Sequence, residues 1–208
     1  FQDGAPNKAT LDKVYDHLDY THALRAFSDT FQGVSVHAVR KGLQNIGVKD
    51  NELIVFSGLM DAKSLFLTTN ADTIYVIGGL DLSKGPMVIE VPSEMLGTVQ
   101  DAWFRWVIDI GLPGPDRGQG GKYLFLPPGH QGEVPAGYHV VPTRTYRHWL
   151  LMRAFVIDGD LAKTAAHVKS HSRLYPLAEA ASPREPHFVD LSGAQFNTIH
   201  ANDFSFYE

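Results

Sequence analysis

Residues 98–110 constrain the fold more than any other stretch, because apolar and polar side chains largely alternate from one position to the next. Successive side chains of a β-strand point to opposite faces, so this alternation predicts one long strand with two different faces. The face that we expect in a core carries Ala102, Phe104, Trp106, Ile108 and Ile110. The opposite face carries Asp101, Trp103, Arg105 and Asp109. The segment therefore predicts a sheet with one buried side.

The polar face of this strand has two interpretations. Arg105 lies between Asp101 and Asp109 along the face and can pair with either carboxylate. If the face is solvated, such ion pairs each contribute less than about 1 kcal/mol to stability. If the face lines a ligand groove, Trp103 is a platform on which a ring of the ligand stacks. Both interpretations stay open at this stage.

Residues 143–157 predict a second long strand with a mixed face. That face holds Arg147, Trp149, Leu151, Arg153, Phe155 and Ile157, and His148 lies on the other side. Two arginines beside a tryptophan could hold a carboxylate or a protein partner. They could equally follow an exposed edge with their apolar stems buried.

The remaining pattern predicts shorter strands and three helices. Strand-like runs cover residues 53–56, 74–77, 87–91, 123–126 and 138–141. Helical spacing favours helices over residues 10–31, with Thr10 as the N-cap, over residues 33–46, and over residues 161–174. We expect an α+β, mainly β protein: a jelly-roll-like antiparallel β-sandwich at residues 53–208, with a helical segment at residues 1–52 packed on it as part of one domain.

Composition excludes several classes of function. The net charge of −5 leaves no basic footprint for nucleic acid, and the lack of cysteine rules out disulfides and thiolate catalysis. No apolar run reaches the length of a membrane span, so we expect no membrane insertion. The start at Phe1 suggests a processed chain, and an excised export signal would place the protein in the periplasm or outside the cell.

Four residues are candidates for acid–base catalysis: Asp72, Asp101, His148 and His200. Asn70 and Asp72 precede a strand, where Asx side chains commonly cap turns by bonding to their own backbone. His167 and His171 have the four-residue spacing of metal ligands, but both point away from the apolar side of their helix, and we expect no metal site. Nothing in the sequence indicates a cofactor.

The C-terminal residues hold the densest group of polar side chains with binding potential. Asn197, His200, Asn202 and Asp203 lie close together in the chain, and three aromatic residues, Phe204, Phe206 and Tyr207, follow. Exposed aromatic clusters usually mark interaction surfaces. We therefore expect this tail to pack against another surface, or the polypeptide to continue.

The chain resembles the domain of unknown function 1254 family. The similarity is carried by residues 70–75, 81–86, 91–92, 118–124, 142–153 and 196–203, in that order. The resemblance implies the first half of a larger protein, often exported, whose second half is another β-rich domain, of unknown function 1214. It also implies a double jelly-roll sandwich, and no activity is established for the family.

These observations favour a binding and assembly module over an enzyme. We expect it to pack against a second β-rich domain of the same protein, or its cleaved fragment, and to form a homo-oligomer. The expected ligand-binding residues are Asn70, Tyr75, Trp103, Arg105, Asp109, Arg153, Asn197, Asn202 and Asp203. A hydrolase with carboxylate–histidine chemistry is the alternative, and carbohydrate binding on the Trp103 face is a weaker one.

Overall fold

The computed structural model describes residue 1, residues 3–65 and residues 70–197. The first helix is α1 (Lys8–Asn45), and the second is α2 (Leu161–His171). The strands are β1 (Leu53–Val55), β2 (Ser64–Leu65), β3 (Ile74–Asp81), β4 (Met87–Val91), β5 (Met95–Asp101), β6 (Trp106–Gly111), β7 (Gly121–Leu126), β8 (His139–Pro142), β9 (Arg147–Ala154), β10 (Arg173–Pro176), β11 (Phe188–Asp190) and β12 (Phe196–Asn197).

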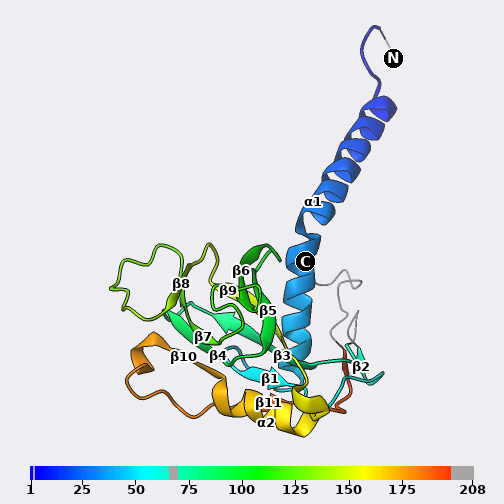
Figure 1. Cartoon of the computed structure of the whole chain (residues 1–208). Coiled ribbons are helices and arrows are strands. Elements are labelled where there is room, and N and C mark those ends of the chain that lie inside the picture. Colours follow the sequence, from blue (N-terminus) through cyan, green and yellow to red (C-terminus); the bar gives the residue numbers. More distant parts are fainter. Residues whose placement is uncertain (2, 66–69, 198–208) are drawn as a thin grey trace.

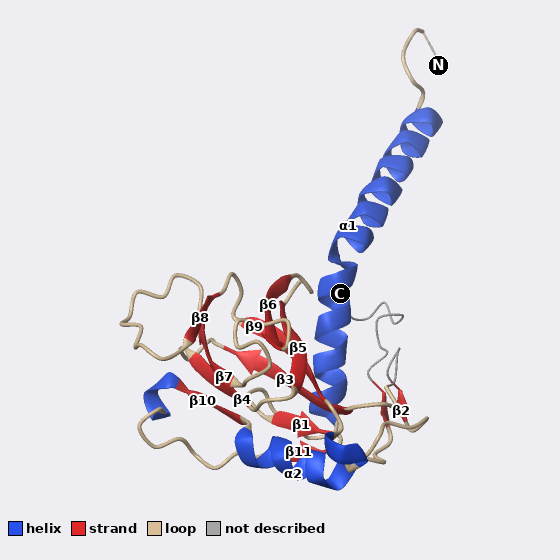
Figure 2. Ribbon diagram, viewed as in Figure 1, coloured by secondary structure: helices blue, strands red, loops and turns tan. Residues whose placement is uncertain are grey.

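Two sheets share one apolar core, which confirms the predicted sandwich of an α+β, mainly β protein (Figure 2). The larger sheet has the order β11-β1-β3-β9-β5-β6, and the smaller has the order β10-β4-β7-β8. Val76 and Leu150 of the larger sheet and Ile89 and Phe125 of the smaller one are fully buried in this core. Most neighbouring strands are antiparallel, but the pairs β1–β11 and β7–β8 are parallel, so both sheets are mixed.

Helix α1 is one continuous helix of 38 residues, and the prediction of two helices is wrong. Its N-cap is Asn7, whose side chain accepts a hydrogen bond from Thr10 N at 2.9 Å, so the predicted cap lies inside the first turn. The helix continues through Gly33, where the missing side chain makes room for a neighbour. A Cβ at this position would lie 2.9 Å from Cε3 of Trp103. The C-terminal part of α1 lies along the larger sheet, and the N-terminal part projects from the body (Figure 1).

The predicted long strand at residues 98–110 is a hairpin, β5–turn–β6. The carboxylate of Asp101 accepts hydrogen bonds from the backbone N–H groups of Trp103, at 2.8 Å, and Arg105, at 3.0 Å, and these bonds hold the turn. Such side chain–backbone bonds compete with strand pairing. Phe104 and Trp106 are 54% and 67% exposed. The prediction of a core face through these two residues is therefore wrong, because the chain reverses where they lie.

Residues 147–154 of the second predicted strand form β9 and have the predicted two faces, and the flanking residues 143–146 and 155–157 lie outside the strand. Leu150 and Met152 lie in the core between the sheets, on the same side of the strand as His148. Trp149 and Leu151 belong to a second apolar cluster, which includes Leu43 of α1. Helix α2 confirms the predicted third helix up to His171; the chain then enters β10, which pairs with β4.

Candidate functional site

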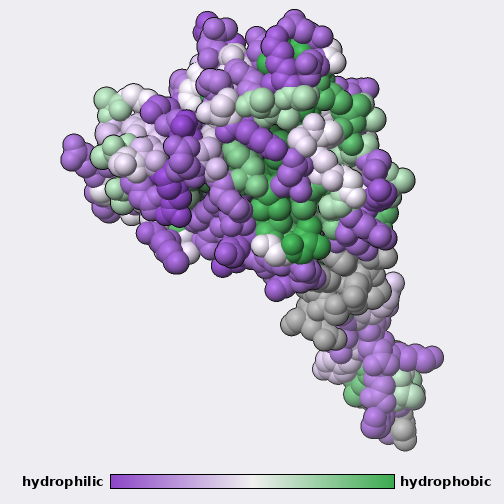
Figure 3. Space-filling model, turned by 90° about the horizontal axis from the view of Figure 1, so that it is seen from below, coloured by the Kyte–Doolittle hydropathy of each residue, from purple (hydrophilic) through white to green (hydrophobic). Residues whose placement is uncertain are grey.

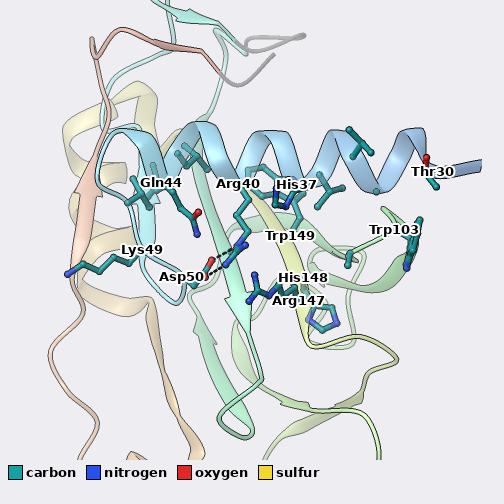
Figure 4. A pocket seen from close by; sticks show the side chains of 18 residues that line it. Thr30, His37, Arg40, Gln44, Lys49, Asp50, Trp103, Arg147, His148 and Trp149 are labelled. Carbon is teal, nitrogen blue, oxygen red and sulfur yellow. Dashed lines mark hydrogen bonds and ion pairs between the residues drawn. The ribbon is translucent and has the colours of Figure 1, made fainter. Parts of the chain in front are cut away.

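A cleft of about 570 Å³ lies between the C-terminal part of α1 and the larger sheet (Figure 4). Its walls come from α1, the segment between α1 and β1, strands β1, β3 and β9, and the β5–β6 turn. Small-molecule sites typically have volumes of about 300–1,000 Å³. The cleft therefore has the size of a ligand site, and it is built where the helix and the sheet separate.

An ion pair fixes the side of the cleft nearest the end of α1. Arg40 donates through Nε to Oδ1 of Asp50 at 2.7 Å and through Nη2 to Oδ2. The side chains of Arg40 and Asp50 are 18% and 22% exposed, so solvent screens this pair less than a surface pair. Gly79 of β3 permits the arrangement, since a Cβ there would lie 3.2 Å from Oδ1 of Asp50.

Arg147 at the start of β9 faces the same space (Figure 4). Its Nη2 lies 3.6 Å from Oδ2 of Asp81, and its side chain is 49% exposed, so this ion pair is loose. Burial alone would raise the pKa of Asp81, but hydrogen bonds from Ser83 and the charges of Arg147 and Arg40 lower it. Within the described residues this is the one ion pair of Arg147, so other guanidinium N–H groups remain for a further acceptor.

The residues that line the cleft carry more positive than negative formal charges. Burial lowers the pKa of His37, and the nearby charges of Arg40, Lys41 and Arg147 lower it further. The charged groups that line the cleft are Arg40, Lys49, Arg147 and Asp50, three cations and one anion.

Two tryptophans form the aromatic part of the lining. Trp149 of β9 is 9% exposed and packs in the apolar cluster under α1. Trp103 of the β5–β6 turn is 46% exposed and lies against the helix at Gly33, at the far end of the cleft from Asp50. Trp103 stands in a turn, so the prediction that it lies on a sheet face is wrong, and carbohydrate binding by this residue stays a prediction. The residue nevertheless reaches a ligand-sized space.

The candidate catalytic residues Asp101 and His148 are direct neighbours in the β5–β9 register. Burial would raise the pKa of Asp101, but the hydrogen bonds from Arg105 and Trp103 lower it. Burial lowers the pKa of His148 to about 4, against the opposing charge of Asp101. Among the described residues, Nδ1 of His148 has no hydrogen-bond partner and Nε2 lies 3.5 Å from Oγ1 of Thr145. Hydrolysis through this pair stays a prediction.

Several of the other candidate residues make local contacts away from the cleft. Oδ1 of Asn70 accepts a hydrogen bond from the backbone N–H of Asp72 at 2.7 Å, as expected for a side chain that caps a turn. Asp72 itself is exposed. Arg153 lies over the ring of Tyr75 at 5.3 Å from its centroid. Arg105 donates through Nε to Asp101 at 2.7 Å.

The rest of the predicted set is scattered or not described. Asp109 is half-buried opposite Thr98, and Asn197 is exposed on β12. His200, Asn202 and Asp203, with the aromatic residues Phe204, Phe206 and Tyr207, lie outside the described residues. Within the described ranges, no group of three His, Asp or Glu residues could hold a metal ion.

The sequence indicated only part of the cleft. The sequence predicts that Arg147 and Arg153, beside Trp149, hold a carboxylate; Arg147 and Trp149 line the cleft, and Arg153 does not. Trp103, the predicted ligand platform, also lines it. Arg40 and Asp50 were not recognised, because their pairing depends on how α1 packs after it ends. The signal in the sequence for this pair is that Arg40, a charged residue, lies on the side of the helix that also carries Val36 and Leu43.

Comparisons with known proteins identify a family and a fold. The family model described as "Protein of unknown function (DUF1254)" matches residues 51–176. A crystal structure of a protein from Vibrio parahaemolyticus is similar, with 21% identity and a TM-score of 0.57 over 79% of this chain and 41% of that chain. An uncharacterised protein from Burkholderia cenocepacia shares 12% identity, with a TM-score of 0.37 over 89% of this chain and 48% of the other.

The chain therefore spans less than half the length of either solved protein. The Vibrio structure supports the fold alone. No curated protein matches the sequence. In the described part of the chain, we find no helix with both the length and the apolar character of a membrane span.

Proposed function

Because the chain belongs to the DUF1254 family of proteins of unknown function, we propose that it is a binding and assembly module whose projecting helix packs against a second β-rich domain. The observation that carries this proposal is the apolar surface of α1. Residues 11–29 are all exposed, although many of them are large and apolar. Figure 3 shows this part of the helix extending beyond the body with hydrophobic residues among hydrophilic ones.

The apolar residues occupy two sides of the projecting part. With 3.6 residues per turn, the first set lies on one side of the helix and the second lies roughly half a turn away. The first set is Leu11, Val14 and Leu18, and the second is Leu24 and Phe31. Each of these side chains is at least 36% exposed. A helix that is apolar on more than one side is normally buried between other elements, so we expect a partner to surround α1.

A second β-rich domain is the partner that we propose, and its β-rich character rests on the family resemblance. The similarity to the Vibrio protein leaves more than half of that chain unmatched, which is enough for another domain. The same apolar sides could pack on a second copy of this chain, so a homo-oligomer is part of the proposal. Export to the periplasm or the medium is also proposed, and it rests on the family resemblance alone.

Hydrogen exchange followed by mass spectrometry tests the contact. The native protein, purified from its source, is compared with residues 1–208 expressed alone. We expect amides of residues 11–31 to exchange more slowly in the native protein, because a covered helix opens less often than a bare one. Equal exchange in the two preparations, together with a native mass equal to this single chain, would overturn the proposal.

Three variants sharpen the test in the native protein. Leu18→Asp and Leu24→Asp place a charge on the two apolar sides, and Thr21→Asp places the same charge between them. We expect the first two to abolish the extra protection and the third to preserve it. A loss of protection in all three would indicate a general effect of charge on the helix rather than a docking surface.

A further inference from the structure

We propose that the cleft between α1 and the larger sheet binds a small organic carboxylate with an apolar or aromatic body. The inference goes beyond the proposed assembly function, because it uses the packed part of α1 rather than the projecting part. No activity is implied: the proposal concerns a binding site and the class of its ligand.

The lining of the cleft determines the body of the ligand. Val36 and Leu43 of α1, Ile54 of β1 and Trp149 of β9 supply apolar walls. Trp103 stands at one end, with part of its indole exposed. Sites of this size commonly combine apolar walls with a few polar groups that fix the orientation of the ligand. A ligand with a ring or a short hydrocarbon chain fits such walls.

The arginines determine the charged group of the ligand. Arg40 is held bidentately by Asp50, so its charge is largely neutralised and its position is fixed. Among the residues that the structure describes, the one ion pair of Arg147 is the long contact of 3.6 Å to Asp81, and its guanidinium lies beside the Arg40–Asp50 pair (Figure 4). A guanidinium with uncommitted donors matches a carboxylate through two parallel hydrogen bonds. Arg147 is therefore the residue that would bind the anion.

The electrostatics of the cleft favour an anion over a neutral or cationic ligand. Three cations and one anion line the space, and Arg40 and Arg147 both lower the pKa of His37. A carboxylate is favoured over a phosphate because only one arginine in the cleft has donors to spare and the remaining walls are mainly apolar. A phosphate dianion has three strong acceptor oxygens and no apolar body to place against these walls.

The test uses calorimetric titration of residues 1–208 with three probes: 3-phenylpropionate, its neutral amide 3-phenylpropanamide, and inorganic phosphate. We expect saturable binding of the carboxylate and at least about tenfold weaker binding of the amide, because a charge-assisted pair is lost. Equal binding of carboxylate and amide would overturn the proposal. Tighter binding of phosphate, or no saturable binding of the carboxylate, would overturn it too.

Matched variants locate the binding. Arg147→Gln is expected to weaken carboxylate binding about tenfold and to remove the preference over the amide. Arg153→Gln is the control, since Arg153 lies on the same face of β9 but stacks on Tyr75 outside the cleft. Trp103→Leu is expected to weaken both organic probes, and Leu24→Asp to change neither. If Arg147→Gln and Arg153→Gln weaken binding equally, the site is not the cleft.

Discussion

The two parts of helix α1 have the same backbone structure and very different surroundings. In the packed part, Ala38, Gly42 and Leu43 are buried against the body. In the projecting part, residues 11–29 are all exposed. The comparison shows that helical periodicity specifies the helix but not its partner, because burial depends on which other element reaches it.

The ion pairs of the two parts differ in the same way. Arg40 and Asp50 are both largely buried, and they tie the packed part to the loop before β1. Lys8–Asp12 and Arg25–Asp29 are exposed pairs within the projecting part. Exposed pairs at this spacing stabilise a helix by only a few tenths of a kcal/mol, roughly 0.3–0.5. The two described ion pairs of the projecting part therefore add little to its stability.

Truncation of a leucine should give the largest difference between the packed and projecting regions. Leu150→Ala removes a fully buried side chain between the two sheets and should lower the free energy of unfolding by about 2–5 kcal/mol. Leu24→Ala on the projecting part should change it by less than about 0.5 kcal/mol. Urea denaturation of the isolated chain measures both. Similar losses would show that the projecting part is packed in solution.

The second prediction concerns pH and the packed region. Burial lowers the pKa of His148 to about 4 from its ordinary value of 6.5, so the unfolded chain binds a proton first as the pH falls. Above about pH 6.5 the imidazole is neutral in both states, and the free energy of unfolding does not depend on it. As the pH falls from 6.5 toward 4, this free energy falls by about 3 kcal/mol. Denaturation at several pH values should show a flatter profile for His148→Gln. The matched change His22→Gln on the projecting part should leave the profile unchanged, and a flatter profile there would contradict the assignment.

Helix caps give the smallest expected difference. Asn7 caps α1 and Asp160 caps α2, and each accepts a backbone hydrogen bond at 2.9 Å from the residue three positions later. Asp160→Ala should lower the free energy of unfolding by about 1 kcal/mol, because α2 packs on the core. Asn7→Ala should reduce only the helical circular dichroism, since fraying of a projecting end is uncoupled from the body. Equal effects on the unfolding midpoint would argue against that separation.

Local signals in the sequence predicted the parts of the fold that depend on neighbours in the chain. The helix predicted at residues 161–174 and the two faces of β9 both have such signals. The β5–β6 hairpin did not, because alternation continues through residues 98–110 and the turn depends on how Asp101 bonds to the backbone. The continuity of α1 through Gly33 also has no local signal. The space at this glycine is filled by Trp103, which is distant in the sequence.

The candidate site was predictable to the extent that one strand forms it. Arg147 and Trp149 lie two residues apart on β9, so their shared face follows from the period of a strand. Arg40, Asp50 and Gly79 come from three different segments, and the packing of α1 on the sheet brings them together. The division of the chain at residues 52 and 53 stays a prediction.

The parallel pairing of β11 with β1 has a consequence for how the chain is made. Strand β1 forms early in the sequence, but the segment that covers its outer edge is Phe188–Asp190, more than 130 residues later. A ribosome must release those late residues before the larger sheet is complete, and until then β1 offers unpaired backbone groups to other nascent chains. A recombinant fragment that stops at residue 176, where the family match ends, would keep that edge open and should aggregate during expression.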